Sequence, residues 1–252
     1  MKKDSSLSSE MHSVANALFF VDDLPTEVGS LYEFNNDDAL HAIRVLRMES
    51  GQFFNLSDGK GNWSHVEAKD VHKKHMTVEV LETGYQDPLD THFTVIQAIP
   101  KGDRIKESIE MCTEGGADRI VMWKASRSIG KSEDKMEKLQ TTAREASKQS
   151  RRFRIPEVTG VALTHAVVDY IAQSDLAIVF HESATMKVSE LVTPGCKKVA
   201  IIIGPEGGLT EDEIDTFAAA GAKVALMGRP VLRSAHAGLA ALSAVNTALS
   251  VW

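Results

Sequence analysis

Short apolar runs alternate with longer mixed segments over the last two thirds of the chain. Three of these runs, LAIVF (176–180), VAIII (199–203) and KVALM (223–227), are about as long as a strand and contain almost no polar residue. Strands that are apolar on both faces are typical of a parallel sheet with helices packed on either side. Earlier runs, FTVIQAI and RIVMW, extend the alternation toward the amino terminus. The pattern predicts an α/β layer fold for this region.

The chain before this region has a β-rich pattern instead. In MTVEVLE (76–82), apolar and polar residues alternate, which predicts a strand with one buried face. The intervening segment DDALHAIRVLRMESG predicts a helix that ends before Gly51. Its expected buried stripe consists of Leu40, Ile43, Leu46 and, less cleanly, Val45.

The segment GYQDPLDTH (84–92) contains a glycine, a proline and two acidic residues and separates the two patterns, as a domain linker does. The opening MKKDSSLSSE is polar and serine-rich, whereas a secretory signal would need an apolar core. We therefore expect a disordered leader at 1–16, a small β-rich domain at 17–86 and an α/β domain at 87–252.

The composition restricts the classes of protein and of site. The formal net charge is −7, and the longest aliphatic stretch, 199–203, is far too short to span a bilayer. We expect a cytoplasmic protein without a membrane segment, in which any nucleic-acid contact rests on a local basic patch. Cys112 and Cys196 form no CxxC, and the nine histidines form no HExxH. Neither a disulfide framework nor a metal site is therefore expected.

The segment IIIGPEGGLTEDEI (201–214) joins an apolar run to a glycine-rich loop and then to a helix start. Thr210 and Glu213 have the spacing of a capping box, so the helix is expected to begin there. Because open α/β sheets bind ligands at the carboxyl ends of their strands, we expect the loops after the three apolar runs to form one pocket. These loops contain HES (181–183), GPEGG (204–208) and GRPVLRSAHAG (228–238).

The loop GPEGG matches neither common phosphate-binding fingerprint. A dinucleotide-binding loop needs GxGxxG and a P-loop needs Lys-Ser/Thr at its end, and this stretch has neither. A ligand held by main-chain amides and carbonyls, such as an adenine or a small zwitterion, is therefore expected. The alternative is that the glycines only form a tight turn between strand and helix.

A basic stretch, REASKQSRRFRIPEV (144–158), ends a long predicted helix. Arg144, Lys148 and Arg151 are spaced to share one helix face, and arginine forks suit phosphates. The stretch is therefore a candidate RNA or DNA contact. The alternative is a solvated helix face paired with acidic residues upstream. Arg44 and Arg47 in RVLR form a second, weaker basic patch.

Several motifs run through the chain from Ala17 to Trp252: LFFVDD, HAIRVLRMESGQFFNLSDGKG, KGDRIKESIEMCTEGGADRI, SRSIGK, REASKQSRRFRIP, IIIGPEGGLTEDEI and MGRPVLRSAHAG. In these motifs the chain resembles the RsmE family of small-subunit (16S) ribosomal RNA uridine N3-methyltransferases, which belong to the SPOUT superfamily. The family patterns EAxxQSxR, IGPEGG and LGxxVLR (here MGRPVLR) are highly specific when they occur together in this order and spacing.

The resemblance implies a first domain that is a PUA-like β-barrel and helps to hold RNA, followed by an α/β domain with a trefoil knot. The knot and the site for the cofactor S-adenosylmethionine are expected at about 176–240. The implied partners are a second copy of the chain, as a homodimer, and small-subunit ribosomal RNA within a nearly assembled subunit. The implied cofactor-binding residues are Phe180, His181, Glu182, Ile203, Gly204, Pro205, Glu206, Gly207, Gly208, Leu226, Met227, Gly228, Val231, Leu232 and Arg233.

Two positions depart from the family pattern. An arginine usually precedes the FF pair, where this chain has Ala17-Leu18. The common LRTETA reads LRSAHA here, so Ala235 replaces a carboxylate and His236 adds an imidazole. Any mechanism that depends on that glutamate therefore needs another group in this chain.

Methylation of uracil at N3 requires removal of the N3 proton and stabilisation of the negative charge that results. Glu145 and His236 are the two candidate proton acceptors, and each could instead have a purely structural role. The candidate groups for stabilising the uracil oxygens are Arg151, Arg152 and Arg233.

The expected RNA contacts are spread over both predicted domains. They are Arg44, Arg47, Arg127, Arg144, Lys148, Gln149, Arg151, Arg152 and Arg154. Two other functions remain possible for such a chain: a non-catalytic RNA-binding factor with the same fold, or a methyltransferase that acts on another RNA position such as a ribose 2′-hydroxyl.

Overall fold

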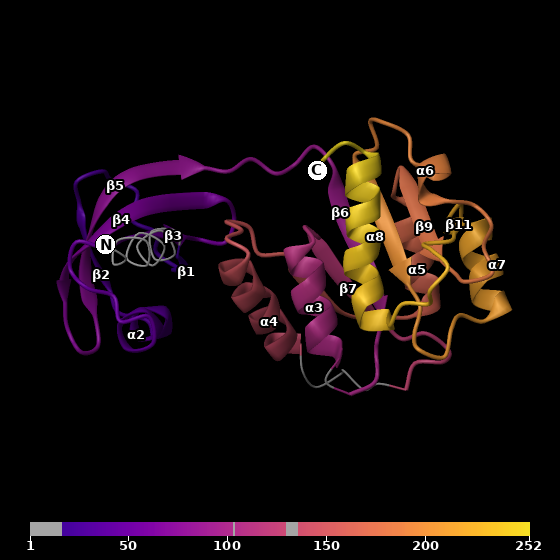
Figure 1. Cartoon of the computed structure of the whole chain (residues 1–252), viewed down its shortest axis with the longest axis horizontal. Coiled ribbons are helices and arrows are strands. Elements are labelled where there is room, and N and C mark those ends of the chain that lie inside the picture. The colour runs from indigo at the N-terminus through magenta and orange to yellow at the C-terminus, as the bar shows by residue number, and fades with distance from the viewer. Residues whose placement is uncertain (1–16, 103, 130–135) are drawn as a thin grey trace, which may run out of the picture. The chain divides into compact units, whose positions relative to one another are not determined.

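The computed structural model describes residues 17–102, 104–129 and 136–252, so the leader expected at 1–16 lies outside the described residues. The chain forms two compact units (Figure 1). The first contains the described part of Met1–Pro88 together with Ser147–Ile155, and the rest of the described chain forms the second. None of the helices in the described segments is long and apolar enough to cross a lipid bilayer.

The first unit is built on a five-stranded sheet in the order β1-β3-β4-β5-β2. β1 pairs with β3 in parallel, and the remaining neighbours are antiparallel. The rings of Phe19, Phe34 and Phe54 meet at centroid distances of 5.5–5.9 Å in its core. The elements are β1 (Leu18–Phe20), β2 (Leu31–Phe34), α2 (Asp37–Arg44), β3 (Phe53–Ser57), β4 (Asn62–Val71) and β5 (Met76–Tyr85).

The strand predicted at 76–82 is confirmed, whereas the helix predicted to end before Gly51 is partly wrong. The apolar positions Met76, Val78 and Val80 of β5 are all fully buried. Helix α2 ends at Arg44, and its buried residues include Ala39 and Ala42 instead of the larger stripe. Of that stripe, Leu40 and Ile43 are half-buried and Val45 and Leu46 are exposed. The small alanine side chains allow the helix to lie closely against the aromatic core.

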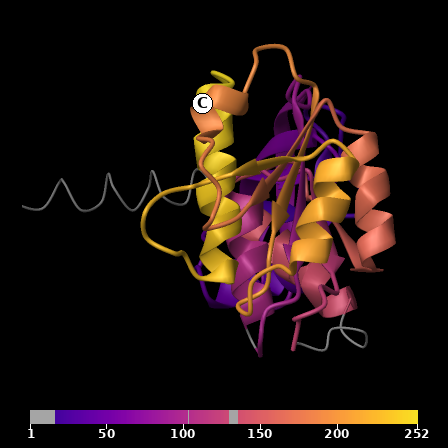
Figure 2. The same ribbon diagram turned by 90° about the vertical axis from the view of Figure 1, so that its right-hand side faces the viewer.

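The second unit contains a six-stranded, wholly parallel sheet in the order β11-β9-β10-β6-β7-β8. Helices α3 and α8 cover one face, and α5 and α7 cover the other (Figure 2). This confirms the predicted α/β layer fold. The strands are β6 (His92–Ala98), β7 (Arg119–Trp123), β8 (Glu157–Ala162), β9 (Leu176–Phe180), β10 (Lys198–Ile203) and β11 (Lys223–Ala225). The helices are α3 (Arg104–Glu114), α4 (Met136–Gln149), α5 (Thr164–Ala172), α6 (Val188–Leu191), α7 (Glu211–Ala219) and α8 (Ser234–Ala248).

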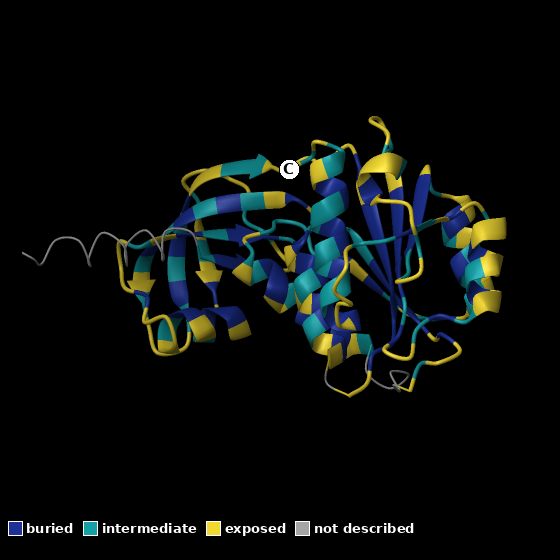
Figure 3. Cartoon of the chain, turned by 45° about the vertical axis from the view of Figure 1, so that its right-hand side comes forward, coloured by how far each residue is buried: buried dark blue, intermediate teal, exposed yellow. Residues whose placement is uncertain are grey.

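The core of the second unit is the buried middle of this sheet (Figure 3). In this core, Trp123 on β7 contacts Phe217 on α7, with ring centroids 5.3 Å apart. The sequence did not predict β8 or α5, and the run KVALM forms only a three-residue strand. Only two of the six residues of β8 are buried, and the strand contains a glycine, so its sequence lacks the continuous apolar signal of the central strands.

The segment Ser147–Ile155 leaves the second unit and belongs to the first, which the predicted boundary near residue 86 did not anticipate. Lys148 Nζ lies 2.6 Å from Asp38 Oδ1, and both side chains are about nine-tenths buried. The ring of Phe153 stacks on Trp63 at 5.8 Å, and the Ile155 amide donates to the Gly59 carbonyl. An ion pair, a ring contact and backbone hydrogen bonds thus hold the returning segment.

We expect Lys148→Ala to lower the free energy of unfolding by about 3 kcal/mol, because it leaves the Asp38 carboxylate buried without its ammonium partner. Lys138→Ala, which removes an exposed lysine from the same helix, is the matched control and should change stability by less than about 0.5 kcal/mol. Urea denaturation of the two variants measures the difference. Equal stability of both variants would show that the buried ion pair contributes nothing.

Candidate active site

Three strands of the second unit end together at one edge of the sheet. β9 lies between β10 and β11, and all three are parallel. In the register, Ile202 pairs with Val179 and Ala225 pairs with Phe180. The parallel, adjacent arrangement predicted for these strands is therefore confirmed. The loops that follow them start from neighbouring points, as a site at the carboxyl ends of strands requires.

These loops enclose a pocket of about 520 Å³, a size typical of small-molecule sites. Every residue expected to bind the cofactor lines it, from all three loops. Five further residues line the pocket. Pro230, Ser234 and Ala237 belong to the loop 228–238 that was expected there, whereas Arg127 and Leu209 lie outside the predicted loops. Among the described residues, no cluster of three or more His, Cys, Asp or Glu side chains is placed to hold a metal ion.

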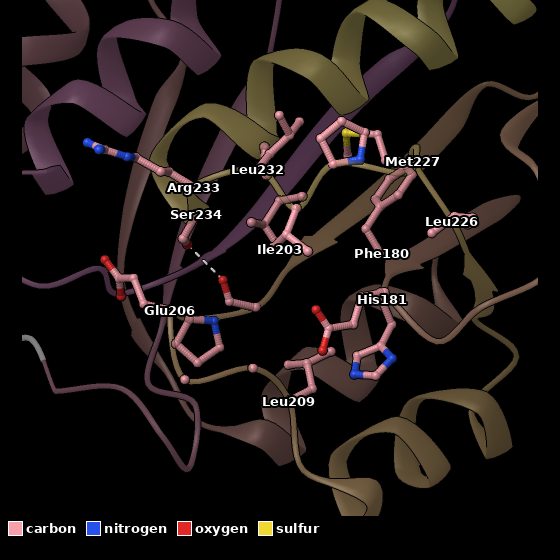
Figure 4. Close-up of a pocket in the computed structure, with 18 of the residues that line it drawn as sticks. Phe180, His181, Ile203, Glu206, Leu209, Leu226, Met227, Leu232, Arg233 and Ser234 are labelled. Atoms are coloured by element: carbon pink, nitrogen blue, oxygen red, sulfur yellow. Dashed lines mark hydrogen bonds between the residues drawn. The ribbon is translucent and has the colours of Figure 1, made fainter.

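The walls of the pocket differ in polarity. Phe180, Ile203 and Met227 gather on one side, and Glu206 and Arg233 lie on the other (Figure 4). Glu206 Oε1 accepts from the Lys101 amide at 3.2 Å and lies 3.9 Å from Arg104 Nη1. One end of a ligand would therefore meet aliphatic and aromatic side chains, and the other would meet charged groups.

The loop Gly204–Gly208 is both a tight turn and a pocket wall. The Gly208 amide donates to the Pro205 carbonyl at 2.9 Å, and Gly208 has φ +73°, a conformation that favours glycine. Arg127 Nη1 donates to the carbonyls of Gly207 at 3.0 Å and Leu209 at 3.3 Å. Arg127 was predicted to contact RNA, and the structure places its guanidinium against this loop.

The capping box predicted at Thr210 and Glu213 is confirmed at the start of α7. Glu213 is buried, and its carboxylate accepts from the Thr210 amide at 2.9 Å and from the Ser126 amide at 2.7 Å. Burial acts to raise the pKa of Glu213, but the hydrogen bonds from Ser126 and Thr210 outweigh it and lower the pKa below its ordinary value. One buried carboxylate thus ties the glycine-rich loop and α7 to the segment after β7.

A hydroxyl relay joins the start of α8 to the glycine-rich loop. Ser234 Oγ donates to the Gly204 carbonyl at 2.7 Å (Figure 4) and accepts from Gln97 Nε2 at 2.9 Å. Gln97 is fully buried near the end of β6. The sequence did not identify this relay. A glutamine inside the apolar run FTVIQAI was the available signal, because a buried amide needs a hydrogen-bonding partner.

The predicted catalytic groups lie in different places. Arg233 lines the pocket and directly precedes α8. His236 is not among the lining residues, and its Nε2 lies 3.0 Å from Glu107 Oε1 of α3. Ala235 is fully buried, so the side chain that replaces the family carboxylate points into the core. Glu145 is exposed on α4.

The structure corrects the predicted cationic helix face. Helix α4 ends at Gln149, so Arg151 lies beyond it and does not share a face with Arg144 and Lys148. Lys148 is buried against Asp38 instead of exposed.

The other predicted RNA contacts differ in exposure. Arg154 donates twice to the Gln86 carbonyl and lies 5.0 Å from the centroid of the Tyr85 ring. These contacts occupy its guanidinium within the first unit. Arg144 and Arg152 are half-buried, whereas Arg44, Arg47, Gln149 and Arg151 are exposed.

Comparison with known families defines the class of protein. Residues 87–246 match the family model of the RNA methyltransferase domain, and residues 34–81 match that of the RNA methyltransferase PUA domain. The chain therefore combines an RNA methyltransferase domain, which contains the pocket, with a PUA domain built on the smaller sheet.

More specific relatives identify the family. The chain is 33% identical over 244 residues to the ribosomal RNA small subunit methyltransferase E of Mycobacterium bovis, which covers 93% of each chain. It is 28% identical over 233 residues to the Bacillus subtilis protein of the same name, covering 87% of this chain and 91% of that one. The chain belongs to the ribosomal RNA small subunit methyltransferase E family.

A solved structure shows the same fold with a ligand. It is a Legionella pneumophila protein described as a methyltransferase, in complex with the bound cofactor S-adenosylmethionine. The two chains are 25% identical, with a TM-score of 0.81 over 93% of this chain and 98% of that one.

Ser234→Ala should lower the free energy of unfolding by about 1–3 kcal/mol, because it leaves the Gly204 carbonyl without its hydroxyl donor and removes one of the two hydrogen bonds of Gln97 Nε2. Ser243→Ala is the control, since that hydroxyl bonds only to the Leu239 carbonyl of its own helix. Denaturant unfolding compares the two. If both variants are equally stable, the relay does not hold the loop.

The low pKa of Glu213 predicts a specific pH dependence. Because the folded-state pKa of Glu213 lies below the ordinary glutamate value of 4.5, the stabilisation by this carboxylate is complete above that value and is lost as the pH falls through the folded-state pKa. The stability difference between the wild type and Glu213→Gln should therefore be largest near neutral pH and shrink in acid. Thermal unfolding across this range tests it, and a pH-independent difference would contradict it.

Proposed function

We propose that this protein transfers a methyl group from S-adenosylmethionine to N3 of a specific uridine in small-subunit (16S) ribosomal RNA. Family membership and the pocket at three parallel strand ends support this activity. The pocket is the observation that carries it, because all the residues expected to bind the cofactor line one cavity.

The composition of the pocket suits S-adenosylmethionine. When bound, this cofactor supplies an electrophilic methyl group on a sulfonium, and it carries no phosphate. Phe180, Ile203 and Met227 would hold the flat adenine, and main-chain groups of the loops would contact the polar edges. The bound cofactor in the Legionella relative supports the same assignment.

In this proposal, one of two side chains accepts the proton from uracil N3. Glu145 is exposed and could accept the proton directly. His236 has a carboxylate partner, Glu107, at Nε2, which would hold the ring so that Nδ1 accepts the proton. Arg233, Arg151 or Arg152 would stabilise negative charge on the uracil oxygens.

The two predicted domains take different tasks in this proposal. The domain at residues 17–86 holds the RNA, and the domain at residues 87–252 carries the methyl transfer. Because Ala17-Leu18 lacks the usual family arginine, the exposed Arg44 and Arg47 near the end of α2, the first arginines after that position in the sequence, could replace that contact. Folded RNA in a nearly assembled subunit would present the target base.

Three family properties complete the proposal: a trefoil knot at about 176–240, a homodimer and a cytoplasmic location. The knot is supported by the path of the chain after β11. The Leu226 amide donates to the Met186 carbonyl at 2.8 Å. The chain then returns from the edge strand β11 to α8, which packs on α3, β6 and β10.

The activity is tested by incubating small ribosomal subunits from a strain that lacks this protein with labelled S-adenosylmethionine and the purified chain. Mass spectrometry of the nucleosides should identify N3-methyluridine at one position. Label on a ribose 2′-hydroxyl would indicate a different methyltransferase. RNA binding without label transfer would indicate a non-catalytic factor.

The two candidate bases are separated by Glu145→Gln and His236→Gln. The variant that removes the proton acceptor should lower kcat by about 10²–10⁴-fold. The variant of the group that is not the proton acceptor should retain most of the activity. Binding of S-adenosylmethionine, measured by calorimetry, should be unchanged in both. Full activity of both variants would exclude both groups as the proton acceptor.

A further inference from the structure

The chain reversal after helix α4 places an arginine in a backbone conformation that favours glycine. The Arg152 amide donates to the Ser147 carbonyl at 2.9 Å, and the Arg151 amide donates to the Lys148 carbonyl at 3.2 Å. These two bonds define a Schellman motif, in which the residue at the position of Arg151 is left-handed and usually glycine. Arg151 has φ +57°, and its Cβ therefore makes the fold less stable than glycine would.

No hydrogen bond or ion pair of the Arg151 side chain with the described residues offsets this backbone strain. The side chain is exposed, and it forms no hydrogen bond or ion pair with any other described side chain or backbone group. Two neighbouring cations, by contrast, have partners within the first unit. Lys148 is paired with Asp38, and Arg154 donates to the Gln86 carbonyl and packs on Tyr85. The contacts that attach the segment Ser147–Ile155 to the first unit thus make no use of the Arg151 head group.

A second arginine, Arg47, also combines a left-handed backbone conformation with an exposed side chain. Arg47 follows α2, has φ +53° and is exposed, and its side chain also lacks a hydrogen bond or ion pair with the described residues. Only one other non-glycine residue in the described segments has a positive φ, Ser250 near the carboxyl terminus. Both arginines belong to the first unit, and Arg47 falls in the part that matches the PUA domain.

We infer that the guanidinium groups of Arg151 and Arg47 bind phosphates of the RNA substrate, a role that would offset the unfavourable backbone conformation of both residues. This inference rests on the proposed function. A guanidinium can donate two parallel hydrogen bonds to one phosphate. In a protein of net charge −7, such local cations are needed to attract a polyanion. Strained residues that the fold does not require are commonly functional.

The glycine variants Arg151→Gly and Arg47→Gly test the inference because they separate folding from binding. Each removes a charge and also relieves the left-handed strain, so each should fold at least as well as the wild type, with Tm unchanged or raised by about 2–4 °C. Ser250→Gly is the matched control, since it relieves the same kind of strain without removing a charge. Binding to small ribosomal subunits that lack the modification is measured at several salt concentrations.

We expect each arginine variant to bind the subunits about tenfold more weakly than the wild type and to lower the slope of log K against log salt by about 1. Ser250→Gly should bind like the wild type. Arg151→Lys, which keeps the charge and the strain, should bind more tightly than Arg151→Gly.

Subunit binding and salt dependence equal to wild type in both glycine variants would overturn the inference. A large fall in Tm of either variant would also overturn it, because that residue would then be needed for folding. Failure of the proposed function is a separate result. It would appear as a wild-type protein that transfers no methyl group to the subunits, whereas failure of this inference leaves wild-type transfer intact.

Discussion

The parallel pairing of β9 with both β10 and β11 is the constraint on which the rest of the site depends. It forces three chain reversals onto one edge of the sheet, and each reversal contributes a loop to the pocket. The loops are then fixed by a few buried polar contacts. Ser234 joins α8 to the Gly204 carbonyl, and Glu213 joins α7 to the segment after β7. Because these groups are held before a ligand arrives, little of the binding energy is spent on ordering the pocket.

The second organising feature is the path of the chain between the two units. Helix α4 begins in the second unit, and the segment that follows it is attached to the first by the Lys148–Asp38 ion pair and the Phe153–Trp63 contact. The first unit therefore contains two kinds of cation. Lys148 and Arg154 maintain the structure, whereas Arg151 and Arg47 expose charged groups at strained backbone positions. The division explains why charge spacing along a helix did not predict which of these cations are exposed.

The sequence predicted the central part of the fold well because burial on both faces leaves a continuous apolar signal in β9 and β10. The capping box at Thr210 could also be predicted from the sequence, since two side chains and two amides within four residues determine it. Contacts between residues far apart in the sequence could not be predicted. The pairs Gln97–Ser234, His236–Glu107 and Lys148–Asp38 depend on tertiary packing. The expected stripe on α2 failed because alanines met the core in place of the larger side chains.

A crystal structure of the protein with S-adenosylmethionine would test the central claim most directly. The account predicts that the adenine lies against Phe180, Ile203 and Met227, and that main-chain groups of Gly204–Gly208 and Leu226–Gly228 contact the cofactor. The Ser234–Gly204 hydrogen bond should be retained in the complex. A cofactor bound elsewhere on the chain, or one that displaces Ser234 from Gly204, would contradict the account.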